Sequence, residues 1–576
     1  MSCKEKILSE DYLDLIEESL IRDDENVCYN KYCEQKLTNN VSLFYVSREE
    51  IRDQFPTAEM YSRLPKCYGL TGGGLETSQP ATQFNPLPLS NSGIFAVQNP
   101  PLRLTGTGTI YAIIDTGIDY QSPLFRNPDG TTRILAIWDQ TNQNGSPPSH
   151  FFYGTEYTDL QINDSFLYDN PLDYVNTIDK IGHGTKLAAV AVGNGLKDNI
   201  MFTSPAHDAN LVVVKLKQAK NYFRDLYLIP QQVPCYEESD IMTALLYVRS
   251  FVRTGIRPVV VFMGLGSSFG NHEGTASLGN FIAEISAIRN FAMVCGAGNE
   301  GNTGHHYEGT NLIGNGDAQN VEINVSEGND GFFMEFWAQA PAVYDLVIRS
   351  TAGESTGIIN DRNGRNAIYS FVYGESQLMV NYVLSDEYSG WQSAYLRFYR
   401  PIEGLWNISV IPTDTSVITR FHLWLPIQNF LNSPVSFVRP SPYVTLTPPS
   451  AIRGLITVSG YDSYSGSFYI ASSRGYTTEG RVKPDFAAPA VEVSTPGGSE
   501  NDTELSGTIV AGAIAQMLQW AVTEGNDPMI DSNEIKNYII RGCNRDPGIT
   551  YPNREFGYGT FDLARVFQRI AGISIM

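Results

Sequence analysis

Two patterns of apolar positions alternate along most of the chain. Helix-like stretches such as "GTKLAAVAVG", "SDIMTALLYVRSFV" and "LGNFIAEISAIRN" lie between short runs that are apolar at successive positions. These runs are "IYAIID" (110–115), "NLVVVKL" (210–216), "RPVVVFMGLG" (257–266), "FAMVCGAGN" (291–299) and "GLITVSG" (454–460). Strands buried on both faces and separated by helices predict a parallel α/β sheet. Ligands of such sheets bind beyond the carboxyl ends of the strands.

The pattern changes between about 315 and 445. Short alternating segments such as "VEINVSEG", "FFMEFWAQ" and "ITRFHLWLP" follow one another with almost no helical spacing. This texture predicts an all-β sandwich or jelly roll inserted into the α/β domain. After Pro448 the α/β pattern returns.

The first 75 residues are predicted to form a small separate α/β unit. "KILSEDYLDLIEESLI" has apolar residues at helical spacing, and "VSLFYVSREEIRDQF" predicts a strand followed by a helix start. From Tyr68 to Pro101 the chain is rich in Gly, Pro, Ser and Thr, which is typical of a linker. The predicted organisation is therefore an N-terminal unit (1–75), a linker (76–100), an α/β domain in two parts (101–314 and 446–576) and the β insertion (315–445).

Composition narrows the classes of partner. Of 576 residues, 42% are apolar and 18% charged, as in ordinary globular proteins. No apolar run approaches the ~18 residues of a membrane span. Acidic residues interrupt the apolar positions of the N-terminus, so we expect no secretory signal peptide and synthesis inside the cell. A formal net charge of −22 disfavours nucleic acid and anionic membranes as partners, and is explained most simply by solubility.

Neither a metal site nor a cofactor is predicted. The seven cysteines are scattered without a CxxC pair, so reduced and mostly buried thiols are expected rather than a zinc site or a disulfide framework. We find no dense run of oxygen ligands that would place a cation.

Three polar residues stand where buried strands or glycine turns meet the expected crevice. Asp115 closes the strand "YAIID", where a carboxylate can hold the tautomer of a histidine. His183 lies between glycines in "IGHGTKLAAVAVG", at the start of a helix. Asn299 ends "FAMVCGAGN", where its amide can donate to a developing oxyanion. Each alone is weak, because Asp and Asn commonly serve caps and turns, but their order and contexts together are specific.

The motifs "AIIDTGIDY", "GHGT", "VVVFMGLGSSFGNHEG", "VCGAGNEG" and "YIASSRGYTTEGRVKPDFAAPAVEV" resemble the subtilisin-like serine proteases, the subtilase or S8 family. The resemblance covers about 100 to 570 apart from the β insertion. It implies that Asp115 and His183 are the acid and base of a catalytic triad and that Asn299 belongs to the oxyanion hole. It also implies that Gly264, Leu265 and Gly266 form the edge strand that pairs with the substrate backbone.

A narrower resemblance is to the clostridial germination proteases, the Csp group. It rests on "SRLPKCYGL", "VQNPPLRLTGTGTIYAIIDTGIDY" and the inserted β segment. It implies that residues 1 to about 70 are a prodomain whose end lies in the substrate cleft, and that the protein is incorporated into the spore. The implied partners are its own prodomain, another Csp protein or the zymogen of a cortex hydrolase. Some members of this group are inactive pseudoproteases.

The nucleophile of the triad is missing from "ELSGTIVAGAIAQMLQW" (504–520). Matched from the left with the family's "GTS", the serine position holds Ile509. Matched from the right through "VAGA", about five residues including the serine are expected to be absent. The right-hand register is favoured because it keeps "QMLQW" in its expected place, and Ile509 is the residue named for the position of the missing serine. Ser506 and Thr508 are expected to serve as turn or cap residues rather than replacements.

Two functions remain open from the sequence. A pseudoprotease acting in germination signalling is favoured, because His183 has no hydroxyl to activate. The alternative is an active serine endopeptidase that processes a cortex-hydrolase zymogen. A third reading, in which the β insertion binds carbohydrate or protein, is less favoured because aromatic residues that alternate along strands usually form a core.

Overall fold

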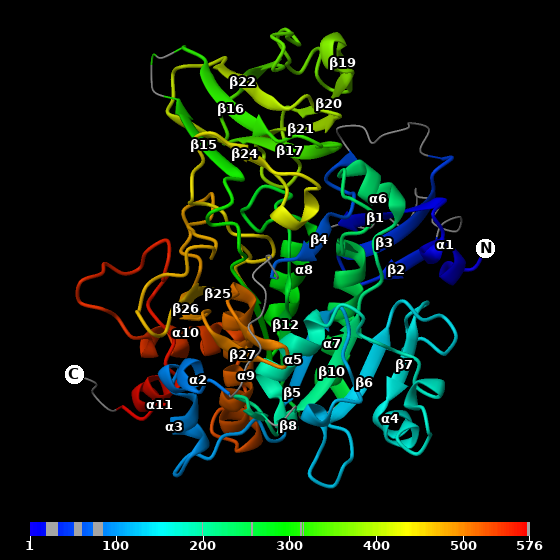
Figure 1. Cartoon of the computed structure of the whole chain (residues 1–576), viewed down its shortest axis with the longest axis vertical. Coiled ribbons are helices and arrows are strands. Elements are labelled where there is room, and N and C mark those ends of the chain that lie inside the picture. The colour runs from blue at the N-terminus through cyan, green and yellow to red at the C-terminus, as the bar shows by residue number, and fades with distance from the viewer. Residues whose placement is uncertain are drawn as a thin grey trace.

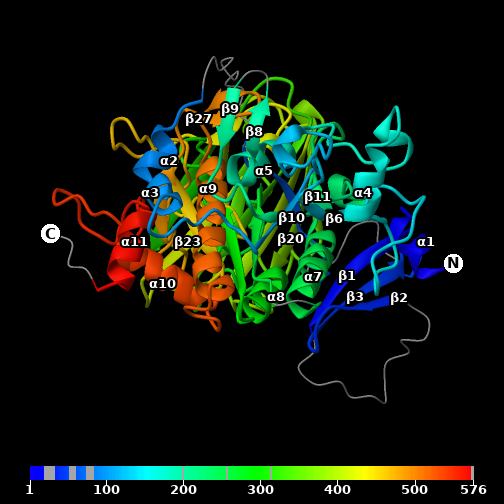
Figure 2. The same cartoon turned by 90° about the horizontal axis from the view of Figure 1, so that it is seen from below.

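The structure is a computed structural model (Figure 1), and it describes residues 1–18, 33–50, 60–72, 84–197, 200–254, 257–311, 314 and 316–572. The predicted helix start after residue 50 and the stretch 73–83, which begins with two glycines, lie outside these residues. The N-terminal strands and the C-terminal helix lie at opposite ends of the molecule (Figure 2).

The predicted parallel sheet is confirmed and forms the centre of the molecule. Its strands are all parallel except the last, which runs antiparallel to its neighbour at the edge of the sheet. Their order is β26 (Phe486–Pro489), β25 (Ile456–Tyr461), β14 (Phe291–Gly296), β12 (Val259–Met263), β5 (Ile110–Asp115), β10 (Asn210–Lys215), β6 (Ile134–Asp139) and β7 (Thr155–Thr158). Because β5 is central, its carboxyl end opens at the middle of the crevice.

Helices cover both faces of this sheet, and side chains alternate between them. Ile113 of β5 packs into the core beneath one set of helices and Ile114 into the core beneath the other. The first set is α2 (Leu87–Asn91), α3 (Ile94–Gln98), α5 (His183–Val192), α9 (Thr503–Leu518), α10 (Ser532–Gly542) and α11 (Leu563–Ile570), and the second is α7 (Glu238–Thr254) and α8 (Ser277–Ser286). Smaller elements are α4 (Asp159–Ser165), α6 (Asn221–Leu226), β8 (Asn194–Lys197), β9 (Ile200–Thr203), β27 (Val493–Thr495) and β28 (Gly498–Glu500).

Helix α9 is the most enclosed of these helices. Within the described part of the chain, the segment Thr503–Thr523 is the one helical stretch long and apolar enough to cross a membrane, but 94% of its most apolar window is buried inside the protein. Its apolarity is that of a central core helix, so it gives no clear membrane span.

The N-terminal unit contains α1 (Cys3–Leu8) and a sheet of β1 (Tyr12–Glu18), β3 (Val41–Ser47) and β2 (Cys33–Lys36), in that order. The helix predicted across residues 6–21 is wrong for Tyr12–Glu18, and residues 19–21 lie outside the described residues. Leu13 and Ile16 are three residues apart, which fits a helix, but all seven residues of β1 pair with β3. Pairing with a distant strand overrides the local spacing.

The structure also corrects the prediction of reduced thiols. Cys3 of α1 and Cys33 of β2 form a disulfide, with their Cα atoms 5.3 Å apart. Cys67, Cys235, Cys295 and Cys543 are free and buried, as expected.

The predicted linker contains regular structure. β4 (Cys67–Leu70) lies between β11 (Tyr236–Glu237) and β13 (Leu265–Gly266), and α2 and α3 pack into the core through Leu89, Ile94 and Val97. The composition, rich in Pro and Gly, predicted a linker. The segment forms a strand and helices instead because these apolar side chains are buried in the core.

Strands dominate residues 306–437, which begin slightly before the predicted insertion. Two antiparallel sheets enclose a core rich in aromatic residues, so the alternating aromatics mainly pack inside. One sheet has the order β15 (His306–Asn311), β23 (Thr419–Trp424), β17 (Gly331–Ala338), β21 (Gln392–Tyr399), β20 (Ser376–Val383) and β19 (Ala367–Phe371), and the other β18 (Tyr344–Arg349), β22 (Gly404–Pro412), β16 (Gln319–Val325) and β24 (Val435–Phe437). The jelly-roll assignment stays a prediction.

Candidate active site

Asp115 and His183 meet at the carboxyl end of the central strand. Asp115 is the last residue of β5, and His183 is the first residue of α5, behind the left-handed N-cap Gly182. His183 Nδ1 lies 2.9 and 3.0 Å from the two carboxylate oxygens of Asp115. An Nδ1–H that donates to this carboxylate leaves Nε2 as the lone-pair nitrogen. The pair therefore has the arrangement of an oriented general base.

The buried surroundings tune the base. Burial alone would lower the pKa of His183, but the charge and hydrogen bond of Asp115 outweigh it, so the pKa of His183 is raised above its usual value. His183 Nε2 is itself buried and has no hydrogen-bond partner in the described part of the protein. The base is thus oriented, with its second ring nitrogen left unpaired among the described residues.

Gly264 allows this pair to lie against the edge strand. A Cβ atom at Gly264 would come within 2.7 Å of Asp115 Oδ2 and 2.6 Å of the Leu187 side chain. Any larger residue would therefore push the carboxylate away from His183.

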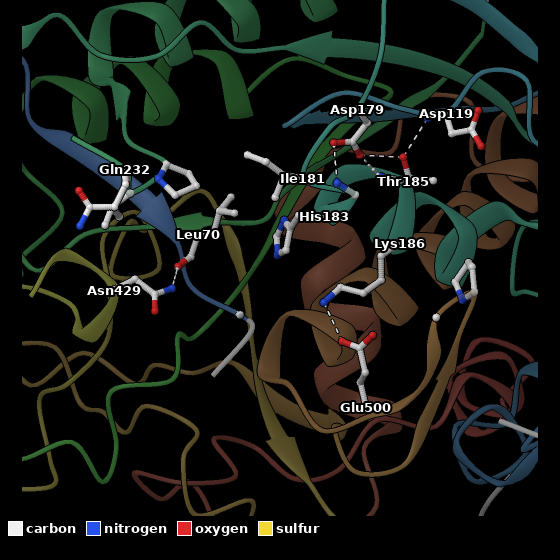
Figure 3. A pocket seen from close by; sticks show the side chains of 16 residues that line it. Leu70, Asp119, Asp179, Ile181, His183, Thr185, Lys186, Gln232, Asn429 and Glu500 are labelled. Atoms are coloured by element: carbon white, nitrogen blue, oxygen red, sulfur yellow. Dashed lines mark hydrogen bonds and ion pairs between the residues drawn. The ribbon is translucent and has the colours of Figure 1, made fainter. Parts of the chain in front are cut away.

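The predicted substrate-binding strand is occupied by the chain itself. Leu265 and Gly266 form β13 and pair antiparallel with Leu70 and Gly69 of β4. The Leu70 carbonyl also accepts a hydrogen bond of 2.7 Å from Asn429 Nδ2 (Figure 3). An extended segment that adds a strand to an exposed edge is a standard mode of peptide recognition.

Asn299 holds the residue that follows β4. Its Nδ2 donates to the carbonyl oxygen of Thr71 and, at 2.8 Å, to Asp502 Oδ1. Its Oδ1 accepts from the Thr503 N–H at 3.2 Å. The amide predicted for an oxyanion hole thus donates one hydrogen bond to the carbonyl of Thr71 and a second one to the carboxylate of Asp502.

The start of α9 corrects the assignment of Ile509. The helix begins at Thr503, and its N-cap Asp502 accepts a hydrogen bond of 3.0 Å from the Glu504 N–H. Ile509 lies in the second turn, fully buried in the core, away from the cleft. No residues are missing ahead of it, because the helix simply continues back to Thr503.

Ser506 and Thr508 also differ from their predicted roles. Both are buried inside α9 rather than at its cap. Ser506 Oγ donates to the Pro489 carbonyl at 3.0 Å, and Thr508 Oγ1 lies 2.8 Å from the Tyr111 hydroxyl. Each hydroxyl is engaged in the core, so neither replaces the nucleophile.

Glu504, and not Ile509, faces the segment that follows β4. It lies five residues before Ile509, in the first turn of α9, which is the length that the right-hand register predicted to be absent. Thr71 Oγ1 donates to Glu504 Oε1 at 2.6 Å. A Cβ at Gly296, the last residue of β14, would come within 2.6 Å of this carboxyl group. Counting five positions back from Ile509 without a deletion would have found Glu504 in the sequence.

The charges of Asp502 and His183 both affect the pKa of Glu504. Burial, and then the charge of Asp502, raise the pKa of Glu504 to about 8, although the Thr71 hydrogen bond and the charge of His183 oppose the shift. At neutral pH Glu504 is therefore mainly protonated, and a carboxylic acid faces Thr71.

We expect the segment around Thr71, which is hydrogen-bonded to Glu504, to be held less stably as the pH rises. A carboxyl group whose pKa is higher in the folded state than in the unfolded state contributes stability at low pH, and this contribution is lost as the pH rises through about 8. Hydrogen exchange of the β4 amides in the wild-type chain should therefore accelerate between about pH 6 and 9, after correction for intrinsic rates.

The variant Glu504→Gln isolates this effect. Its amide cannot ionise and should give a flatter profile, with the β5 amides as an internal reference. An identical pH profile in both proteins would exclude Glu504 as the titrating group.

A cavity of about 760 Å³ opens beside His183 (Figure 3). Lys186 and Glu500 form an ion pair of 2.8 Å at its wall. The Asp179 carboxylate accepts from the backbone N–H groups of Gly182 and Thr185, which fixes the turn into α5. Elsewhere the wall includes Leu70 and Gly72 of the chain's own segment.

No group of three or more His, Cys, Asp or Glu side chains in the described ranges could hold a metal ion.

An Asp–His pair at the end of a parallel strand, beside an edge strand that binds an extended segment, defines a subtilisin-like α/β protein. The model of the subtilase family (peptidase S8) matches residues 440–559, which include the start of α9. A subtilisin-like protease of Arabidopsis thaliana is 26% identical over 229 residues, which is 38% of this chain and 28% of that relative. The chain is thus similar to the subtilisin-like serine proteases in the sequence of residues 440–559 and in its fold.

Among solved structures, the fold is similar to that of the CspB protease of Clostridium perfringens. The two share 25% sequence identity with a TM-score of 0.73, over 84% of this chain and 97% of that one.

Proposed function

We propose that the chain is a catalytically inactive member of its family, a pseudoprotease. The observation that carries this proposal is Glu504, whose buried carboxyl group faces Thr71 at the head of α9. A carboxyl group that is hydrogen-bonded to Thr71 cannot act as the serine nucleophile does. In this proposal the Asp115–His183 pair therefore has no hydroxyl to deprotonate for attack on a peptide carbonyl.

A second obstacle supports inactivity. Asp502 accepts a hydrogen bond from Asn299 Nδ2, the donor that an oxyanion would need. A negative charge beside this amide opposes charge developing on the Thr71 carbonyl. The site is therefore unsuited to acyl transfer at both the nucleophile and the oxyanion positions.

The first 72 residues act, in this proposal, as a prodomain that stays bound. Their last described strand is β4, which fills the edge-strand site. The boundary near residue 75, the β insertion as a separate domain and incorporation into the spore complete the proposed organisation.

The biological role that we propose is germination signalling in spores. Support comes from the fold similarity to the CspB protease and from the motif resemblance to the Csp group. The partner would be another Csp protein or a cortex-hydrolase zymogen, recruited by binding and not by cleavage.

A fluorophosphonate probe tests inactivity directly. We expect no covalent adduct on the full chain, no hydrolysis of peptide substrates and a single full-length band after storage, with an active subtilisin as the positive control. In germinating spores, a gene encoding His183→Ala should complement a deletion as well as the wild-type gene.

An adduct in the first turn of α9, including at Thr503, would contradict the proposal. Failure of His183→Ala to complement would do so as well. Either result would favour the alternative of an active endopeptidase.

A further inference from the structure

Six apolar side chains between β7 and α5 are exposed, and we call them together the apolar patch. Their exposed fractions are 71% for Leu160, 85% for Leu167, 50% for Tyr168, 41% for Tyr174, 40% for Ile178 and 48% for Ile181. Single exposed apolar residues are normal on protein surfaces, but six within one segment of 22 residues are a recognised sign of an interaction site.

The patch has a fixed backbone. Helix α4 starts with a capping box between Thr158 and Gln161. The rings of Tyr168 and Tyr174 stack with their centroids 5.0 Å apart, and Ile162 and Val175 anchor the segment in the core. The exposed side chains are therefore presented in a defined arrangement, which lowers the entropy cost of binding.

Acidic residues surround these apolar side chains. Five aspartates occur between residues 159 and 179, and the segment that carries the patch holds one basic residue, the exposed Lys180. Asp164, Asp169 and Asp173 are exposed. A like-charged nucleic acid or anionic membrane would be repelled, whereas a basic partner is attracted.

The patch continues into the wall of the cleft. Ile181 belongs to the patch and also lines the cavity beside His183, as does the neighbouring Asp179 (Figure 3). A partner bound to the patch would therefore reach the rim of the cleft without displacing β4.

From the apolar side chains, the surrounding aspartates and the position at the cleft rim, we propose that this patch docks a basic amphipathic segment of a partner protein. Leucine-like side chains of the partner would cover Leu160 and Leu167, and its Lys or Arg residues would face Asp164, Asp169 and Asp173. An Arg of the partner could also lie over the Tyr168–Tyr174 stack. This inference does not depend on whether the chain is an active protease.

A labelled synthetic helix of about 18 residues, with leucine on one face and lysine on the other, is the probe. Fluorescence anisotropy with the full chain, at about 0.15 M salt, should show binding to wild type. The variants Leu167→Ser/Tyr168→Ser and Asp164→Asn/Asp169→Asn/Asp173→Asn should each bind about tenfold more weakly. All five side chains are exposed, so folding should be unaffected.

A charge-matched control distinguishes the effect of the patch on binding from the effect of the protein's net charge. The variant Glu322→Gln/Glu327→Gln/Glu403→Gln removes three exposed acidic charges from the β insertion and should change affinity by less than about twofold. Equal weakening by both triple variants, or no binding by wild type, would overturn the proposal. So would binding of the chain to anionic vesicles through the patch, or a wild-type dimer that Leu167→Ser/Tyr168→Ser abolishes.

Discussion

Replacing Asp502 with Gly and Glu504 with Ser is expected to make the chain cut itself between Thr71 and Gly72. The Thr71 carbonyl already faces the Asn299 amide, and the Thr71 side chain already contacts Glu504. A serine at position 504 would place a hydroxyl in this contact, with His183 held by Asp115 as its base. The product should be an N-terminal fragment that ends at Thr71.

Both substitutions are needed for the full effect. Asp502 shares the hydrogens of the Asn299 amide, and a Cβ at Gly72 would come within 1.8 Å of its carboxylate. Loss of one oxyanion donor typically slows catalysis by about 10²–10³-fold, so Glu504→Ser alone should cleave about 10²-fold more slowly than the double variant. Glycine remains a tolerated N-cap for α9.

Intact mass spectrometry of the purified double variant gives the readout. Adding His183→Ala should leave the chain whole, because the base is then missing. Cleavage that survives His183→Ala, or a folded double variant that stays intact, would contradict the inferred position of the Thr71–Gly72 bond next to residue 504 and His183.

Neutralising Asp14 should remove one of the main links between the N-terminal unit and the rest of the chain. Asp14 of β1 is buried and lies 2.6 Å from Lys220 Nζ, while Ser239 Oγ donates to its other oxygen at 2.9 Å. Removing one partner of a buried ion pair costs about 3–5 kcal/mol, because the other charge stays buried without compensation.

The expected loss for Asp14→Asn is about 3 kcal/mol, near the lower end of that range. Burial, with Asp14 among the contributing charges, raises the pKa of the adjacent Glu237 to about 8. Removing the charge of Asp14 lets Glu237 ionise more readily and compensate in part. Urea denaturation of the full chain measures the free energy of unfolding.

The matched control is Asp11→Asn. Asp11 is exposed directly before the same strand, so the change should stay within about 0.5 kcal/mol. Equal effects of the two substitutions would mean that the buried pair contributes no net stability.

The sequence predicted the central sheet well because its strands are apolar at successive positions, a pattern that few other structures produce. Asp115 could be placed at the end of its strand for the same reason, whereas Asn299, predicted to end a strand, lies three residues beyond the end of β14. By contrast, the pairing of β1 with β3 and the disulfide between Cys3 and Cys33 depend on contacts between distant segments, which local spacing does not encode.

The error at the nucleophile position had a different cause. The small residues of the motif fit two registers, and neither register uses the acidic residues Asp502 and Glu504. Asp502 caps α9, which is a common role for Asp and could have been read from the sequence. The contact of Asn299 with Thr71, however, joins residues more than two hundred positions apart and needed the structure.

The pairing of β4 with β13 determines how well a free peptide can compete for this edge strand. Because this strand is part of the same chain, a free peptide competes not with a dilute ligand but with one whose effective concentration is in the millimolar range. Gly69 also lies beneath Phe430 and Ile427, so the β insertion covers the tethered strand from above. Peptides in solution at micromolar levels would leave the strand in place, and signals from partners would reach the protein through its outer faces.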